Sequence, residues 1–344
     1  MPREIVVVAG GDVTLGHHYE EWVDGLRAKG VSGPAVDGYG FLQVKPLFAG
    51  ADLVVVNLEC PFTERGAPIP KNFNFRARLS TVQVLVEAGV KVVSLANNHL
   101  MDYGPEGVAD TLATLDAAGI AHFGAGRNLA EARKPAIVEV GGLKIAFLGY
   151  LILGAKHPEP EVVWATETRA GVPGHPSDWT VVETMVREDV AAARKEADLV
   201  VPFFHWGREG SKGPDAYQLQ LARAAVESGA AVVLGSHPHV LHGMELQGRV
   251  PVFYSLGNLV FGGNWNPRDK DSVLVRMRLD RRGYLGSELF PLKTDHLPEA
   301  PIQPYPLQAA EKEGVLQRLR TASAAFTTPL PALTPAPVPV SASP

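Results

Sequence analysis

The sequence of 344 residues contains one cysteine, Cys60, which excludes an internal disulfide and a zinc site built from thiolates. Its net charge is only −5, without the basic excess that nucleic-acid-binding proteins carry on their contact face. It also lacks an apolar run of about 18 residues, the length that a membrane-spanning helix needs. These absences favour a globular protein with no nucleic-acid partner and no membrane span.

A short apolar stretch over 5–11 lies near the N-terminus, and Asp12 follows it directly. This stretch is shorter than the apolar region of a secretory signal peptide. We therefore interpret it as a buried strand and expect a cytoplasmic protein. Hydrophobic residues make up 46% of the chain and charged residues 20%, as in globular proteins with a large core.

Apolar segments rich in β-branched residues alternate with helical segments over residues 1–300. We expect strands at 5–8, 53–56, 90–95, 136–139, 144–149, 199–204, 231–234, 252–256 and 273–279, and helices at 80–88, 105–118, 179–196 and 215–228. Apolar strands joined by helices are typical of an α/β fold with a largely parallel sheet and helices outside it. Asp280-Arg281-Arg282-Gly283 predicts the turn of an antiparallel hairpin.

The C-terminal part of the chain differs in composition from residues 1–300, which we interpret as one domain. Residues 301–326 are predicted to be a helical extension, because 307–326 has helical composition and no proline. Residues 327–344 contain six prolines, no charge and no aromatic side chain. Such a segment cannot form a packed core, which predicts a disordered tail.

Six of the predicted strands end in polar residues. These ends read Gly10-Gly11-Asp12, Asn57-Leu58-Glu59, Asn97-Asn98-His99, His205-Trp206-Gly207, Gly235-Ser236-His237-Pro238-His239 and Gly257-Asn258. In open α/β sheets, ligands bind beyond the carboxyl ends of the strands. We therefore expect these side chains to converge on one site.

The polar side chains at the strand ends are of the types that bind metal ions. The predicted ligands are Asp12, Glu59, Asn98, His205, His237 and His239. Oxygen and imidazole donors without thiolate suit Mn²⁺, Fe or Zn²⁺ rather than Ca²⁺. Six donors are too many for one tetrahedral ion, which predicts two divalent ions about 3.5–4 Å apart that share a carboxylate and activate a bridging water. Their excess positive charge would attract an anionic substrate.

Taken singly, each of these residues also has a structural interpretation. Asp12 and Glu59 suit turns or caps, Asn98 suits a turn, and His205 suits a hydrogen-bonded place in the core. The pair of imidazoles in His237-Pro238-His239 is hardest to attribute to packing. The metal site is therefore predicted from the set rather than from any one member.

Further candidates lie close to the predicted ligands in the sequence. His99 follows Asn98 directly and is the candidate general acid for a leaving group. Arg76 precedes the Asn-Asn-His strand, and its guanidinium suits a substrate phosphate or carboxylate, with an exposed surface charge as the alternative. Asn258, at the last strand end, is a candidate substrate contact or brace. The irregular segment 151–179 is expected to cover the site.

These motifs resemble those of the CapA family, the bacterial capsule or poly-γ-glutamate synthesis proteins, which belongs to the calcineurin-like metallophosphoesterase superfamily. The resemblance covers about residues 5–262. Besides the strand ends above, it includes Asp102 and Gly104, Glu209 and Tyr254-Ser255-Leu256-Gly257-Asn258. It implies a four-layer α/β/β/α sandwich of the metallo-dependent phosphatase type, with the site at the strand ends.

The resemblance also implies roles for single residues. It assigns Asp12 and His239 to a first metal, Asn98, His205 and His237 to a second, Glu59 to the bridging position, His99 to the catalytic histidine and Asp102 to its orientation. Two positions depart from the superfamily pattern. Thr14 stands where a ligand histidine is usual, with His17 or His18 as possible replacements, and Glu59 stands where the bridging residue is usually aspartate.

Two functions follow from this interpretation. The first is a metal-dependent hydrolase that acts on a phosphoester, or on a γ-glutamyl or peptide amide, in capsule, polyglutamate or cell-wall metabolism. Its substrate would be an anionic small molecule or polymer. The second is a non-catalytic, metal-stabilised component of poly-γ-glutamate or capsule synthesis.

Overall fold

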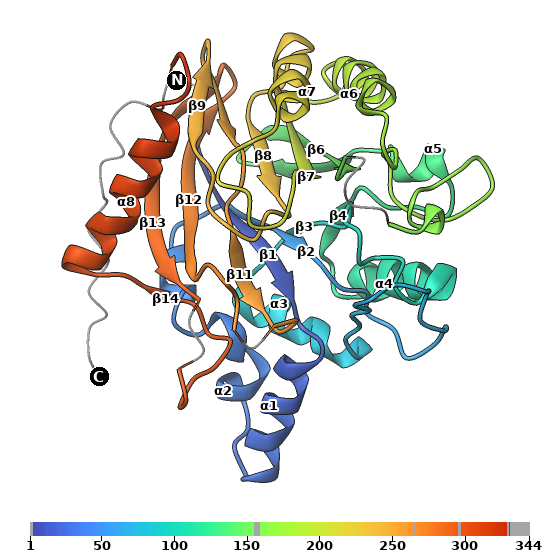
Figure 1. Ribbon diagram of the computed structural model, residues 1–344, viewed down its shortest axis with the longest axis vertical. Helices are drawn as coiled ribbons and strands as arrows, with labels where there is room; N and C mark the ends of the chain where they lie inside the picture. Colours follow the sequence, from blue (N-terminus) through green and yellow to red (C-terminus); the bar gives the residue numbers. More distant parts are fainter. Residues whose placement is uncertain (1–2, 155–158, 265, 295–296, 329, 331–344) are drawn as a thin grey trace.

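The computed structural model describes residues 3–154, 159–264, 266–294, 297–328 and 330, which form two β-sheets and the helices around them (Figure 1). The first sheet, of eight strands, has the order β14 (Tyr305–Pro306), β13 (Gly283–Lys293), β12 (Asp271–Asp280), β1 (Ile5–Thr14), β2 (Leu53–Leu58), β3 (Val92–Ser94) and β4 (Ala121–Phe123), and β11 (Asn258–Phe261) pairs with β1. The second, of six strands, has the order β5 (Ala136–Val140), β6 (Leu143–Ile152), β7 (Leu199–Trp206), β8 (Val233–Ser236), β10 (Val250–Phe253) and β9 (Met244–Gln247).

Both sheets are mixed, which corrects the expectation of one largely parallel sheet. Strands β1 to β4 run parallel, and so do β6, β7, β8 and β10. Antiparallel strands extend each sheet at its edges. The predicted hairpin is confirmed, because β12 and β13 pair antiparallel around the turn at Asp280 and Gly283.

Helices cover the outer face of each sheet. Those on the first sheet are α1 (His18–Ala28), α2 (Pro34–Asp37), α3 (Gln83–Ala88) and α4 (Gly104–Ala117), and those on the second are α6 (Trp179–Ala193) and α7 (Ala216–Glu227). Short helical segments lie at α5 (Leu129–Ala132), Tyr39–Phe41, Lys45–Phe48, Leu79–Val82 and Glu161–Val163. In Figure 1, α6 and α7 lie at the top and α1 and α2 at the bottom, with the strands between them.

The strand residues alternate between two apolar layers, as the two-residue period of a strand requires. In β2, Val54 and Val56 pack toward α3 and α4, whereas Val55 packs between the two sheets against residues such as Phe147 of β6. A third apolar layer joins β6 and β7 to α6 and α7. The chain is therefore a four-layer α/β/β/α sandwich, as predicted.

The helix α8 (Ala309–Ser323) lies beside β13 and β9, along one side of the sandwich (Figure 1). Its side chains Val315, Leu316 and Leu319 are buried in the layer between the sheets. The helix predicted within 307–326 is thus present and closes the core on this side. Most of the predicted tail, 327–344, lies outside the described residues.

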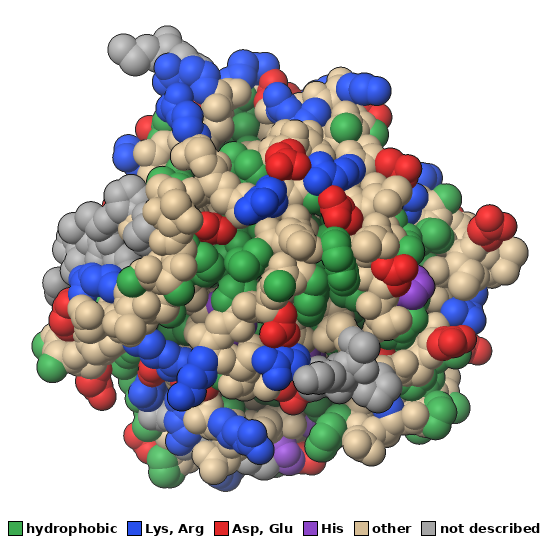
Figure 2. Space-filling view, turned by 45° about the horizontal axis from the view of Figure 1, so that its top comes forward, with side chains coloured by type: hydrophobic (Ala, Val, Ile, Leu, Met, Phe, Trp, Pro, Cys, Tyr) green, Lys and Arg blue, Asp and Glu red, His purple; other side chains and the backbone are tan. Residues whose placement is uncertain are grey.

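The surface has no segregation of charge on the face shown in Figure 2, where basic and acidic side chains are interspersed. This matches the small net charge of −5. Among the helices that the structure describes, none combines the length and the apolar character needed to cross a membrane.

Candidate metal centre

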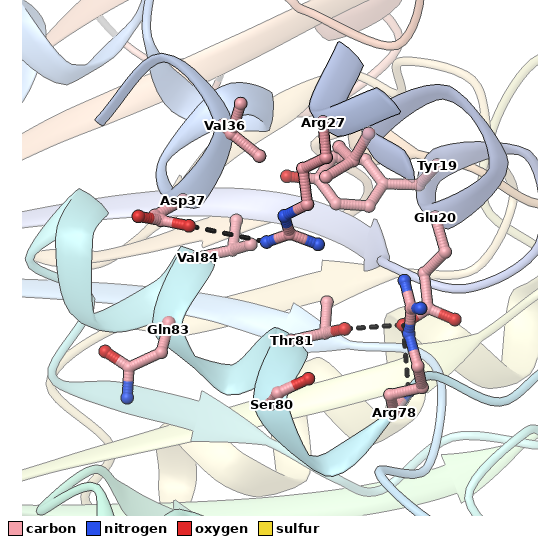
Figure 3. A pocket seen from close by; sticks show the side chains of 11 residues that line it. Tyr19, Glu20, Arg27, Val36, Asp37, Arg78, Ser80, Thr81, Gln83 and Val84 are labelled. Carbon is pink, nitrogen blue, oxygen red and sulfur yellow. Dashed lines mark hydrogen bonds and ion pairs between the residues drawn. The ribbon is translucent and has the colours of Figure 1, made fainter. Parts of the chain in front are cut away.

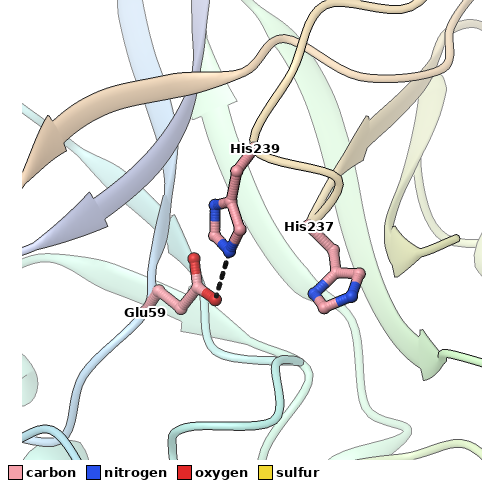
Figure 4. A group of neighbouring side chains, drawn as sticks. All are labelled: Glu59, His237 and His239. Carbon is pink, nitrogen blue, oxygen red and sulfur yellow. Dashed lines mark ion pairs between the residues drawn. The ribbon is translucent and has the colours of Figure 1, made fainter. Parts of the chain in front are cut away.

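The six predicted metal ligands meet at the carboxyl ends of strands from both sheets. Asp12 lies in β1, Glu59 follows β2, His205 lies in β7, and His237 and His239 follow β8. Figure 4 shows Glu59 of the first sheet reaching toward the two histidines of the second. The side chain of Asn98 joins the same group, as its distances show.

Glycine allows β1 to place Asp12 in this group. A Cβ atom at Gly11 would lie 1.8 Å from the carbonyl oxygen of Gly257. The chain before β11 therefore approaches β1 more closely than any larger residue would permit. The backbone N–H of Asp12 donates to that carbonyl at 3.1 Å, and the strand register shifts on either side of Asp12. This irregularity fixes the carboxylate at the junction of three strands.

The donors form two subgroups. In the first, Nδ1 of His239 lies 3.2 Å from Oδ2 of Asp12 and 2.8 Å from Oδ1 of Asn258. In the second, Nε2 of His205 lies 3.0 Å from Oδ1 of Asn98 and 3.0 Å from Nδ1 of His237. The family resemblance assigns Asp12 and His239 to one metal and Asn98, His205 and His237 to the other, and it assigns Asn258 to neither.

Glu59 reaches both subgroups. Its Oε1 lies 3.4 Å from Nε2 of His205 and 3.9 Å from Nε2 of His239. Both carboxylate oxygens are buried, and within the described part of the chain neither accepts a hydrogen bond. A buried carboxylate without hydrogen bonds is costly unless a cation neutralises it.

The donor atoms are close enough to share cations. Those of Glu59, His237 and His239 lie within 4.8 Å of one another, and so do those of Asp12, Glu59 and His205. Carboxylate, amide and imidazole donors together suit a divalent transition metal. The residues present therefore fit a divalent cation, and the orphaned oxygens of Glu59 are the clearest sign of it.

The charges of the cluster are strongly coupled. Burial raises the pKa of Asp12, but His239, His205 and the hydrogen bond from Asn57 outweigh burial, so that the net shift is downward. Burial and the nearby charge of Asp12 raise the pKa of Glu59. Burial lowers the pKa of His239, but the two carboxylates outweigh it and raise that pKa. The cluster thus attracts positive charge.

Three residues that the sequence analysis did not single out brace these donors. Nδ2 of Asn57 donates to Oδ1 of Asp12 at 2.8 Å, and Asn97 donates to Asn57 at 3.2 Å. The hydroxyl of Ser236 lies 3.0 Å from Nδ1 of His205, so that Nε2 faces the cluster. Outer partners of this kind orient metal ligands. Their signal was their place within two residues of a predicted ligand.

His99 and Asp102 form a buried pair next to the cluster. Nδ1 of His99 donates to Oδ2 of Asp102 at 2.7 Å, and the backbone N–H of Phe75 donates to the same oxygen at 2.6 Å. The ring of Phe75 lies 4.2 Å from that of His99, centroid to centroid. Burial lowers the pKa of His99, while Asp102 opposes this shift. These contacts leave Nε2 as the nitrogen that can exchange a proton with a substrate.

Two charged residues outside the predicted set also reach this region. Nζ of Lys71 lies 2.9 Å from Oδ1 of Asp102 and 3.1 Å from Oε2 of Glu159, and Nδ2 of Asn98 donates to Oε1 of Glu159. Glu159 belongs to the segment 151–179 that was expected to cover the site, of which 155–158 lie outside the described residues. No local sequence signal marks Lys71 or Glu159.

Thr14 stands at the position where the superfamily usually has a ligand histidine, and its hydroxyl is buried. Oγ1 of Thr14 donates to the backbone oxygen of Glu59 at 3.3 Å and so braces the backbone of Glu59. The possible replacements are engaged elsewhere, since Nε2 of His17 lies 2.7 Å from the backbone oxygen of Asn74 and Nδ1 of His18 lies 3.1 Å from Glu21. Neither histidine belongs to a candidate metal group among the described residues.

Arg76 and Arg78 lie outside the cluster. The guanidinium of Arg76 stacks 4.5 Å from the ring centre of Tyr103, and its side chain is exposed. The guanidinium of Arg78 binds Glu20 and Asp24, in a structural role.

A cavity of about 180 Å³ lies beside Arg78, between α1, α2 and residues 79–84 (Figure 3). Its charges pair with one another, because Arg27 binds Asp37 and Arg78 binds Glu20. None of the residues that line this cavity belongs to the candidate metal centre, and its two arginines, Arg27 and Arg78, are both ion-paired.

A family model described as "Bacterial capsule synthesis protein PGA_cap" matches residues 6–263, which include every residue of the cluster. The chain belongs to this family. The resemblance inferred from the motifs is thereby confirmed.

Two relatives are similar in sequence to this chain over most of its length. "PGA biosynthesis protein CapA" of Bacillus subtilis (strain 168) is 33% identical over 297 residues, which are 85% of this chain and 72% of that protein. "Capsule biosynthesis protein CapA" of Bacillus anthracis is 31% identical over 325 residues, covering 92% and 73%. A crystal structure titled as a novel phosphatase from Mycoplasma pneumoniae is similar with a TM-score of 0.50 and 16% identity, covering 86% of this chain and 95% of that one. This last likeness concerns the fold alone.

Proposed function

We propose that this protein is a metal-dependent hydrolase with two divalent cations, Mn²⁺, Fe or Zn²⁺. The proposed ligands are Asp12 and His239 for one ion, Asn98, His205 and His237 for the other, and Glu59 between them. The observation that carries the proposal is the place of Glu59, whose buried carboxylate reaches both subgroups at 3.4 and 3.9 Å.

The chain's own residues supply the remaining chemistry. Divalent cations, when bound, polarise a scissile bond and lower the pKa of water. Asp102 holds Nδ1 of His99, which orients Nε2 to give a proton to the leaving group. Asn258 holds the ring of His239. Arg76 is the proposed contact to a distant anionic group of the substrate, because its guanidinium is exposed one residue after Phe75, which covers His99.

The proposed substrate is anionic. Two divalent ions outweigh the two carboxylates of the cluster, so that the loaded site would carry a net positive charge. The relatives are named for poly-γ-glutamate and capsule synthesis. The substrate class is therefore a phosphoester, or a γ-glutamyl or peptide amide, of a capsule, polyglutamate or cell-wall polymer.

A second candidate function rests on Thr14. With a hydroxyl where a ligand histidine is usual, the first subgroup has fewer donors than the second. A site that holds one ion firmly would serve a metal-stabilised component of poly-γ-glutamate or capsule synthesis that does not itself catalyse hydrolysis.

One experiment separates the two candidates. The purified protein is loaded with Mn²⁺, its metal content is measured, and it is incubated with a chromogenic phosphodiester and with poly-γ-glutamate. Hydrolysis of either substrate that is lost in His99→Ala, and retained in a control outside the cluster, His122→Ala, supports the hydrolase. A metal-loaded protein that cleaves neither, and whose biological role survives His99→Ala, overturns it in favour of the second candidate.

A further inference from the structure

The side-chain amide of Asn98 is contacted on both of its ends. Nδ2 lies 3.1 Å from Oε1 of Glu159, and Oδ1 lies 3.0 Å from Nε2 of His205. An ionised carboxylate only accepts hydrogen bonds. The end of the amide that faces Glu159 must therefore be the NH₂ group, and the oxygen must face His205 and the cluster.

Glu159 is itself held by Lys71. Nζ of Lys71 lies 3.1 Å from Oε2 of Glu159, 2.9 Å from Oδ1 of Asp102 and 2.9 Å from the backbone oxygen of Asn98. The ammonium of Lys71 donates a hydrogen bond to the backbone oxygen of Asn98 and forms ion pairs with the two carboxylates. The side chains are 9% exposed for Lys71 and 16% for Glu159, so that little solvent competes for the contact. The carboxylate of Glu159 is thus fixed rather than free to turn.

We propose that Glu159 is a positioning residue, which fixes the amide of Asn98 with its oxygen toward the metal, and that Lys71 holds Glu159 in place for this purpose. An amide turned by 180° would present its NH₂ group to the cation and would not bind it. Oxygen and nitrogen have nearly the same size, so packing alone does not select the orientation. A hydrogen-bond acceptor on the side of the amide away from the cluster does select it, because it bonds only to the NH₂ group. This inference rests on the proposed function, in which Asn98 is a metal ligand.

Titration of the metal-free full chain with Mn²⁺ in a calorimeter tests the proposal. We expect Glu159→Ala to weaken the Mn²⁺ affinity by about 10- to 100-fold, as the loss of an outer partner of a metal ligand usually does. The matched control is Glu161→Ala, which removes an exposed carboxylate two residues away and should leave the affinity unchanged. An unchanged affinity in Glu159→Ala overturns the positioning role.

The same substitution made in the Asn98→Asp protein shows whether Glu159 acts by orienting the amide or by packing. In Asn98→Asp, both outer atoms of the side chain are oxygens, so there is no amide to orient. We expect Glu159→Ala to cost no Mn²⁺ affinity in this background, and to raise it where the two carboxylates repel each other. An equal loss in both backgrounds would show that Glu159 acts through packing or folding, and would overturn the proposal.

The same titration distinguishes a failure of the proposed metal site from a failure of the proposed role of Glu159. Wild-type protein that binds no Mn²⁺, Fe²⁺ or Zn²⁺ overturns the proposed function and this inference with it. Wild-type protein that binds Mn²⁺, with Glu159→Ala equal to it, overturns only the role of Glu159.

Discussion

Nε2 of His205 and Nδ1 of His237 lie 3.0 Å apart, although one residue lies in β7 and the other follows β8. Two ring nitrogens at this distance share a single proton, since one of them must donate and the other accept. In the proposed function, both rings would hold a divalent cation in place of that proton. The contact therefore brings an imidazole of β7 and one that follows β8 within reach of one shared cation.

The first prediction concerns this contact. His237→Ala should reduce the metal content of the purified protein at least by half and abolish any hydrolytic activity, because the second subgroup would lose one of its imidazoles. Metal content is measured by mass spectrometry of the acid-digested protein. His122→Ala removes a histidine that binds Asp116 away from the cluster and is the control. Full metal occupancy in His237→Ala would contradict the ligand assignment.

The second prediction concerns the carboxylate between the subgroups. Glu59→Gln should raise the melting temperature of the metal-free protein, because it replaces a buried charge whose oxygens accept no hydrogen bond among the described residues. It should also remove most of the stabilisation that Mn²⁺ gives to the wild type, about 2.7 kcal/mol at a hundredfold excess over Kd. Thermal unfolding with a chelator and with Mn²⁺ measures both effects. A lower melting temperature without metal would show that the charge of Glu59 is stabilised by the protein alone.

The third prediction uses the leaving group to test His99. His99→Asn should lower kcat about 10²- to 10⁴-fold for a substrate with an alkyl leaving group, which needs a proton from a general acid. The loss should be much smaller for a nitrophenyl ester, whose leaving group departs as an anion. Asp102→Asn should show the same dependence on the leaving group, because Asp102 holds Nδ1 of His99 at 2.7 Å. Equal losses for both substrates would assign His99 a role other than proton donation.

The sequence predicted much of this architecture because its signals are local. The nine expected strand segments all coincide with strands, since each is a run of apolar β-branched residues. Strands β4, β9, β11 and β14 were missed because each is only two to four residues long; β4 and β9 also carry polar side chains such as His122 and Glu245. The division into two mixed sheets was also missed by the pattern alone, because pairing depends on contacts between distant segments.

The site shows the same division between local and distant signals. The proposed ligands could be predicted as a group because each lies within four residues of the end of a strand, and these ends meet at one edge. Glu159 and Lys71 follow no strand and have no neighbouring motif. They reach Asn98 from 61 and 27 positions away in the chain, and only the folded structure brings them there. Likewise, nothing local distinguishes Arg76, which stacks on Tyr103, from a residue directed toward the cluster.

The last prediction concerns stability at low pH and a histidine outside the cluster. His242 is buried, with Nε2 donating to the backbone oxygen of Ser211 at 2.9 Å, and burial lowers its pKa from 6.5 to about 4. Between these two values the unfolded chain binds a proton that the folded chain does not, so stability falls as the pH falls through this window. The loss attributable to His242 between pH 7 and pH 4 is about 3 kcal/mol. Urea unfolding with a chelator present, at both pH values, should therefore show a loss smaller by about this amount in His242→Gln than in the wild type, because a glutamine does not titrate. The carboxylates and histidines of the cluster are the same in both proteins, so their titration cancels from the comparison. An equal loss in the two proteins would show that His242 takes up a proton in the fold as readily as in the unfolded chain, and would contradict the lowered pKa.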